Sequence, residues 1–174
     1  MMIDVRVWLL LVLGLMPSAC GYHLVGQGDS SVVPGGVETA ALSTTTDATG
    51  KALLAEFQHA WVQHDELPGL QAAKASPKHV NVRIEHAKNT FSPVAFDAAG
   101  LAIQYRLTIS AVLNMYQENA LIWSSGSVVV GANVFGDSAT ANNPSVVEAE
   151  RETLTEQLHL RWANEAMARF KSGF

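Results

Sequence analysis

Apolar and polar residues alternate most regularly over residues 101–115, where one parity is apolar and the other is mostly polar. A period of two predicts a β-strand, and the single apolar face predicts a sheet that is solvated on its other side. Residues from His79 alternate in the same way, and residues 121–135 form a third strand-like run. In this third run Trp123 and Val129 are out of phase with their apolar neighbours, which predicts cover on both faces of that strand.

Two other segments repeat apolar residues at helical spacing. Residues 48–64 follow a cluster of Thr and Asp cap formers, which predicts an amphipathic helix. The C-terminal segment opens with a capping box, Ser145 to Glu148, and continues to about Lys171. Its acidic residues lie toward the start and its basic residues toward the end, as the helix dipole favours. Its apolar stripe has i+4 spacing and consists of Leu154, Leu158, Trp162, Ala166 and Phe170.

The elements follow in the order strand, helix, three strands, helix. A short first strand is predicted over residues 37–43, and loops over 71–77, 92–100, 117–119 and 136–144. The three consecutive strands need only hairpin connections, so they should be antiparallel, and the first strand should add at an edge. Two amphipathic helices on one face of this mostly antiparallel sheet predict an α+β two-layer sandwich of the order β-α-β-β-β-α.

The composition is that of one mildly acidic domain. The chain has 174 residues, of which 48% are hydrophobic, and 11 Lys and Arg against 16 Asp and Glu give a formal net charge of -5. A nucleic-acid binder normally carries a basic stripe, and the sequence suggests none, so we expect no nucleic-acid partner. Cys20 is the single cysteine, which excludes a disulfide within the chain and a thiolate zinc site.

The first residues have the pattern of an export signal. Residues 7–16 are uncharged and apolar; this run is shorter than the roughly 20 residues that span a bilayer, but it suits a signal peptide. Small residues and then Cys20 follow, which resembles a bacterial lipoprotein signal. That resemblance implies cleavage before Cys20 and attachment of fatty acids such as palmitate to this cysteine. Gly21, in place of Asp, implies sorting to the outer membrane.

The chain therefore divides into a lipoprotein signal peptide (1–19), a lipidated tether rich in Gly (20–36) and a single domain (37–174). Two alternatives remain for the N-terminus. One is a plain secreted protein that is cut after Ala19, and the other is a buried apolar N-terminal strand.

No pattern in the chain predicts catalysis. The Ser124 to Ser127 segment lies inside a predicted strand, where a sheet face or a bulge explains it, and no Gly-x-Ser-x-Gly elbow is present. His59 and His64 are five residues apart, so they do not share a helix face as paired metal ligands would. We expect no enzyme activity, no metal site and no cofactor. The histidines are scattered: His23, His59, His64, His79, His86 and His159.

The segment Cys20-Gly21-Tyr22-His23-Leu24 resembles the C-G-[FYW]-H-L opening of the LPS-assembly lipoproteins, the LptE family. The resemblance extends to a strand of the form Val82-Arg83-Ile84, to the strand around Gln104-Tyr105-Arg106-Leu107, and to the order of the elements. It implies a lipoprotein that is anchored on the periplasmic side of the outer membrane. It also implies a one-to-one complex in which this chain plugs and helps to assemble the large β-barrel LptD, and supports the placement of lipopolysaccharide in the outer leaflet.

Some members of that family carry basic residues at their hairpin tips, which suit the phosphates of lipid A. The predicted tip at residues 91–100 has Asp97 and no Lys or Arg, and the loop at 136–144 has Asp137 and again no base. No lipopolysaccharide-binding residue is therefore assigned. Five basic residues fall in the middle of the chain and could form either an anionic-lipid site or a solvated sheet face: Lys74, Lys78, Arg83, Lys88 and Arg106.

Two other functions are alternatives, and each makes a demand on the folded chain. An auxiliary lipoprotein of a phospholipid or ABC-type envelope transport system would need an apolar lipid groove. A periplasmic hydrolase would need His86 or His159 to meet a serine and a carboxylate in the folded chain.

Overall fold

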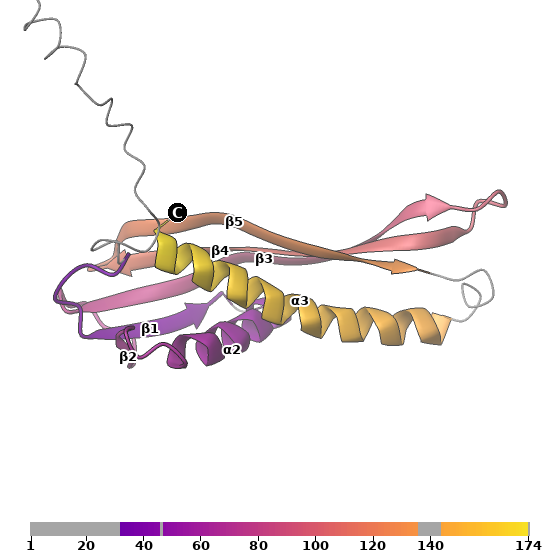
Figure 1. The fold of residues 1–174 in the computed structure, drawn as a ribbon. Helices are drawn as coiled ribbons and strands as arrows, with labels where there is room; N and C mark the ends of the chain where they lie inside the picture. The colour runs from indigo at the N-terminus through magenta and orange to yellow at the C-terminus, as the bar shows by residue number, and fades with distance from the viewer. Residues whose placement is uncertain (1–31, 46, 136–143, 174) are drawn as a thin grey trace, which may run out of the picture.

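The computed structural model describes residues 32–45, 47–135 and 144–173. Two helices lie against one face of a five-stranded sheet, and the molecule is elongated along the strands (Figure 1). This architecture confirms the predicted α+β two-layer sandwich. The elements are β1 (Thr39–Thr44), α2 (Ala48–Val62), β2 (Gly69–Leu70), β3 (His79–Phe96), β4 (Ala102–Gln117), β5 (Ala120–Phe135) and α3 (Pro144–Ser172).

The sheet has the strand order β2-β1-β3-β4-β5. The three long strands form antiparallel hairpins, as predicted. The expectation that the first strand adds at an edge is wrong, because β1 lies between β2 and β3 and runs parallel to both. The reason is that α2 returns the chain to the end where β1 began, and the two residues of β2 then close the edge beyond β1.

The strand β3 is longer than the sequence indicates. It continues through the predicted loop as far as Phe96, and the turn is confined to the residues between β3 and β4. Pro93 is tolerated because β1 pairs only with the first residues of β3, so the rest of that side of β3 is an edge. Asp97 holds the turn, since its carboxylate accepts hydrogen bonds from the backbone N–H groups of Ala99 and Leu101.

A bulge in β5 explains the mixed phase of its apolar residues. Gly126 has a φ of 62° there, and the pairing with β4 shifts register between Val112 and Asn114. The extra residue brings Trp123 to the same face as Val128, against the core. The prediction that both faces of this strand are covered is wrong, because Val129 is 56% exposed. Of the two interpretations of residues 124–127, a sheet face or a bulge, the structure shows the bulge.

The core lies between the sheet and the helices. An aromatic cluster joins α2 to α3: the Phe57 and Trp162 rings are 6.4 Å apart and the Trp61 and Phe170 rings 5.1 Å apart. The indole of Trp162 donates a 3.2 Å hydrogen bond to the carbonyl of Val128, so the buried ring is anchored to the sheet. The predicted apolar stripe of the last helix faces this core.

The helix starts follow the expected chemistry with one change. The carboxylate of Asp47 caps α2 by accepting from the N–H of Gly50. The helix α3 begins at Pro144, one residue before the predicted capping box, so Ser145 lies in its first turn and not at the N-cap. Proline suits a first helical position because no N–H is needed there.

The predicted signal peptide (1–19), Cys20 and most of the predicted tether lie outside the described residues, as does most of the predicted loop over 136–144. Among the helices that the structure does describe, none is long and apolar enough to span a membrane.

Candidate interaction surface

The face of the sheet opposite the helices is open. We call it the outer face, and no described helix covers it (Figure 1). Its side chains come from the polar parity of β3 and β4 and from the matching positions of β5, since alternate residues of a strand point to opposite sides. Among them are Arg83, Glu85, Lys88, Thr90, Arg106, Thr108, Ser110, Asn114 and Tyr116.

A hydrogen-bonded cluster occupies one part of this face. The carboxylate of Glu85 accepts from Asn114 Nδ2 at 2.7 Å and from the Tyr116 hydroxyl at 3.2 Å. The guanidinium of Arg83 lies 4.8 Å from the centre of the Tyr116 ring, a distance typical of a cation–π contact. Burial, and then the nearby charge of Glu85, raise the pKa of Tyr116 above its ordinary value. This part of the outer face is therefore polar and fixed.

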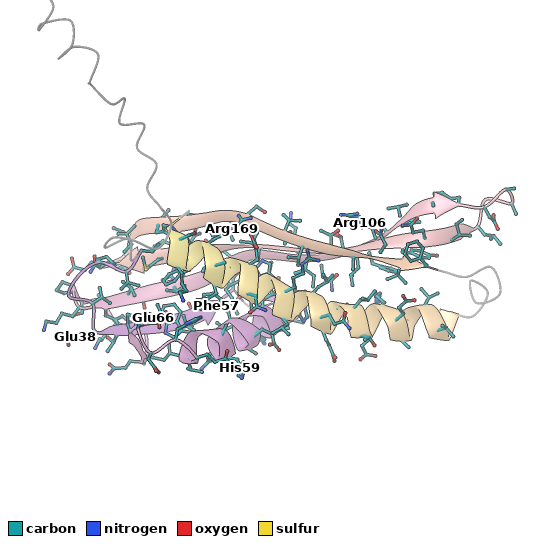
Figure 2. The ribbon with its side chains drawn as sticks, in the orientation of Figure 1. Glu38, Phe57, His59, Glu66, Arg106 and Arg169 are labelled. Carbon is teal, nitrogen blue, oxygen red and sulfur yellow. The ribbon has the colours of Figure 1, made fainter. Side chains whose placement is uncertain are left out.

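Three cations form a row along the outer face. Arg83 pairs with Asn114 of β4 and Lys88 pairs with Ser110. Arg106, which is labelled in Figure 2, belongs to β4 itself. Their positions on β4 are four residues apart, which corresponds to roughly 13 Å per step. None of the three forms an ion pair within the part of the chain that the structure describes. The row is available to an anionic partner.

The other two central lysines are not part of this row. Lys78 pairs with Glu38 at 2.6 Å, which lowers the pKa of that carboxyl, and Lys74 donates to Gln71. The segment 71–78 instead covers the outer face near β1, where Asn81 Nδ2 donates to the Lys74 carbonyl. The five central basic residues thus divide into two groups. Three lie on the solvated face of the sheet, and Lys74 and Lys78 do not.

The segment 71–78 also encloses His79. This side chain is fully buried, and its Nδ1 lies 2.7 Å from the hydroxyl of Thr39. Burial lowers the pKa of His79, with a further contribution from the charge of Lys74. The neutral imidazole is a structural link between β1 and β3.

The far end of the molecule is apolar at its surface. The tip of the β3–β4 hairpin, the end of β5 and the start of α3 lie together there (Figure 1). Asp97 is the charged residue of the hairpin turn, and its carboxylate is engaged with the backbone. The exposed large apolar side chains at this end are Val94, Phe96, Leu101, Phe135 and Val146.

A groove of about 410 Å³ separates the first half of α3 from β3. Its lining is polar and includes three glutamates: Asn89, Glu148, Arg151, Glu152, Thr155 and Glu156. Arg151 pairs with Glu148 and covers the ring of Phe91 at 5.5 Å. A phospholipid tail needs an apolar lining, which this groove does not provide.

The histidines do not assemble a reactive centre in the described residues. His86 occupies a bulge in β3 with a φ of 56°, and burial lowers the pKa of His159. Neither forms a hydrogen bond with a serine or a carboxylate that the structure describes, and the described residues contain no group of three or more His, Cys, Asp or Glu that could hold a metal ion. His64 meets Glu66 at 3.3 Å on the surface.

No protein-family model matches the chain, and no curated protein sequence matches it. Solved structures do resemble its fold. The rare lipoprotein B from Shewanella oneidensis has a TM-score of 0.61 at 11% identity, with 77% of this chain and 94% of that chain covered. The uncharacterized lipoprotein B from Nitrosomonas europaea has a TM-score of 0.58 at 13% identity, with 87% and 88% covered.

A minor lipoprotein from Acinetobacter baumannii gives a TM-score of 0.56 at 7% identity, with 77% of this chain and 92% of that chain covered. At these identities the likeness concerns the fold and not the activity. The chain has a fold similar to that of these bacterial lipoproteins.

Proposed function

We propose that this chain is an outer-membrane lipoprotein that plugs the lumen of the β-barrel LptD, assists assembly of that barrel and supports the transport of lipopolysaccharide to the outer leaflet. The observation that carries the proposal is the open outer face with its row of three cations, Arg83, Lys88 and Arg106, which form no ion pair with any described residue. The lumen of a large barrel is polar and water-lined, so a plug needs a polar surface of this kind.

The fold suits a plug mechanically. The sheet and the helices pack around one aromatic core, so the molecule presents its outer face on a rigid support. The motif at Cys20 and the fold shared with three bacterial lipoproteins support the same assignment. The described surface offers polar and charged side chains for docking, and the function we propose requires no chemical step.

The anchor is the second part of the proposal. Fatty acids on Cys20 would hold the domain at the periplasmic leaflet of the outer membrane. Each buried CH₂ contributes about 0.8 kcal/mol, and a single chain binds only marginally, so several chains on one cysteine give a firm attachment. The domain would then reach the barrel from the membrane surface on which it is held.

The test is recovery of the tagged protein from detergent-solubilised outer membranes. We expect the barrel to copurify in a one-to-one ratio, and Arg106→Glu to reduce its recovery. Lys51→Glu, on an exposed position of α2, is the matched control because it changes the net charge equally on the opposite layer. Recovery without any large barrel would contradict the proposal, and copurified phospholipid in its absence would favour the transport-system alternative.

A further inference from the structure

The two edges of the sheet differ in how they are protected. On one side β2 has only two residues, and the part of β3 that extends beyond β1 is an edge that carries Lys88 and Pro93. At the other edge β5 runs for 16 residues, Ala120–Phe135, without a charged residue or a proline. Natural proteins usually blunt a long edge with charges, proline or a covering element, because an open edge pairs with other strands. An uncharged edge of this length is suited to pairing.

Side chains of α3 protect the first half of this edge. Arg169 Nη1 donates to the carbonyls of Ser125 and Ser127, at 3.2 and 3.1 Å. The indole of Trp123 is held at the end of α3, where it donates to the Gly173 carbonyl. Beyond the bulge, from Val129 to Phe135, no described strand forms backbone hydrogen bonds with the free edge of β5. The open edge is therefore the distal half of the strand.

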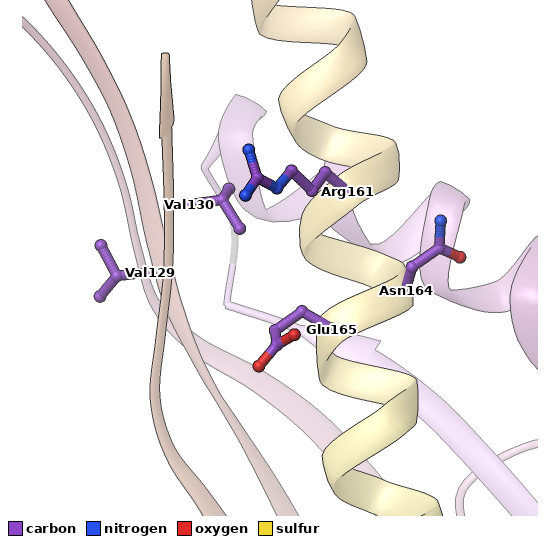
Figure 3. Close-up of a pocket in the computed structure, with 5 residues that line it drawn as sticks. All are labelled: Val129, Val130, Arg161, Asn164 and Glu165. Atoms are coloured by element: carbon purple, nitrogen blue, oxygen red, sulfur yellow. The ribbon is translucent and has the colours of Figure 1, made fainter.

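A groove of about 460 Å³ runs beside this open edge, between β5 and α3 (Figure 3). Val129 and Val130 form its strand side, and Arg161, Asn164 and Glu165 form its helix side. Glu165 already pairs with Arg169 at 3.2 Å. Arg161 forms no ion pair or hydrogen bond with the residues that the structure describes. The groove thus has one uncommitted charge, and that charge is positive.

We propose that an extended segment of the partner adds to the sheet as a sixth strand along Val129–Phe135, and that this segment carries a carboxylate that pairs with Arg161. Main-chain hydrogen bonds would supply affinity in such a strand addition, and alternate side chains would supply specificity. The exposed side chains of Val129 and Phe135, at 56% and 63% exposure, would contact apolar residues of the added strand.

The charge argues against a second copy of this chain as the occupant. Two copies of β5 could pair edge to edge. Because Ala120–Phe135 contains no Asp or Glu, the strand of the second copy would have no carboxylate to pair with Arg161. The identity of the partner as LptD rests on the proposed function. The chemistry of the segment, which is extended, largely apolar and acidic at one position, rests on the edge and the groove alone.

Site-specific photo-crosslinking in cells tests the proposal. A photo-reactive amino acid at Val129 or Asn133, both exposed on β5, should crosslink to one short segment of the barrel, and mass spectrometry should find Asp or Glu in that segment. The same probe at Ala55, an exposed position of α2, is the control and should give little product. Crosslinks to a second copy of the chain, or no crosslinks from the edge, would overturn the proposal.

Charge variants test the pairing with Arg161. We expect Arg161→Glu to reduce the crosslinked yield roughly tenfold and Arg161→Lys to retain most of it, because a like charge across an interface is strongly unfavourable. The double variant Val129→Lys/Asn133→Lys should block pairing with a probe at Gly131, whereas Thr90→Lys on β3 should not. Equal yields for Arg161→Glu and the unmodified protein would overturn the carboxylate assignment.

The outcome also separates this inference from the proposed function. If the barrel copurifies but the edge gives no crosslink, the strand addition fails and the plug remains. If the edge crosslinks to an acidic extended segment of another envelope protein, the strand addition holds and the plug fails.

Discussion

The hydroxyl of Tyr116 donates a 3.2 Å hydrogen bond to Glu85 on the outer face of the sheet, where Arg83 covers the Tyr116 ring. The three side chains come from β3 and β4, so they link the two strands across the outer face. The protonation state of Tyr116 is coupled to folding, since burial and the Glu85 charge both raise the pKa of its phenol.

The raised pKa of Tyr116 predicts a loss of stability in alkali. The folded chain holds the phenolic proton more tightly than the unfolded chain, so this contribution is complete below the ordinary tyrosine pKa of about 10 and is lost as pH rises through the raised pKa. We expect the free energy of unfolding in urea to fall more between about pH 9 and about pH 11 for the unmodified protein than for Tyr116→Phe. An equal decrease in unfolding free energy for the two proteins would contradict this expectation.

The buried His79 predicts a separate loss of stability in acid. Its pKa is lowered by burial, so the unfolded chain binds the proton first; the stabilisation is present above the ordinary pKa of 6.5 and is lost as pH falls through the lowered pKa. His159 adds an effect of the same sign. We expect His79→Gln and His159→Gln each to reduce the pH dependence of the unfolding free energy, measured by urea denaturation from neutral pH to about pH 5.

The replacement Gly50→Ala should destabilise the protein although alanine is the better helix former. A Cβ at this position would lie 2.5 Å from the Thr44 hydroxyl and 2.8 Å from the capping carboxylate of Asp47. The helix propensity gain is about 1 kcal/mol, and the disturbed cap costs about as much or more. The exposed α2 variant Ala55→Gly calibrates propensity alone. A higher urea midpoint for Gly50→Ala would show that the cap relaxes without loss.

The aromatic core predicts a large effect of one truncation. Phe57 is fully buried between α2, α3 and the sheet, so Phe57→Ala should cost about 3–5 kcal/mol of unfolding free energy. Val62, on the same helix, is 60% exposed, and Val62→Ala should change stability by less than about 0.5 kcal/mol. Chemical denaturation of both variants measures the difference. Similar losses of unfolding free energy for the two variants would contradict the central role of Phe57 in the core.

The anchor is tested by Cys20→Ser. Without a thiol to acylate, the protein should leave the outer-membrane fraction and be found free in the periplasm or uncleaved at the inner membrane. Mass spectrometry of the unmodified product should show the added mass of fatty acids at its first residue. If the variant still fractionates with the outer membrane, contacts with the partner are sufficient for its location and the lipid is not.

The fold class followed from local patterns because each element has a strong period of its own. The parity of residues 101–115 and the i+4 stripe of α3 report which side each element buries, and these sides face one another in the structure. The position of β1 could not be derived in this way. Its edge or interior place depends on β2, a two-residue strand whose sequence carries no periodic signal.

The candidate surface was only partly visible in the sequence. The polar parity of β4 indicated a solvated face, but the row of Arg83, Lys88 and Arg106 depends on the register between β3 and β4, and the bulge at His86 sets that register. The open edge of β5 has a compositional signal, sixteen residues without charge, but only the strand order shows that these residues lie at an edge. Register and strand order are long-range properties that local periodicity does not encode.

The parallel pairing of β1 with β3 sets an order of events during folding. Thr39 pairs with His79, about 40 residues away, whereas the hairpins of β3, β4 and β5 close over turns of a few residues. Short loops close at lower entropic cost, so the three-stranded hairpin sheet should form before β1 and α2 dock onto it. In a pulsed hydrogen-exchange experiment the amides of β4 should gain protection earlier than those of β1, and the N-terminal strand would complete the domain last.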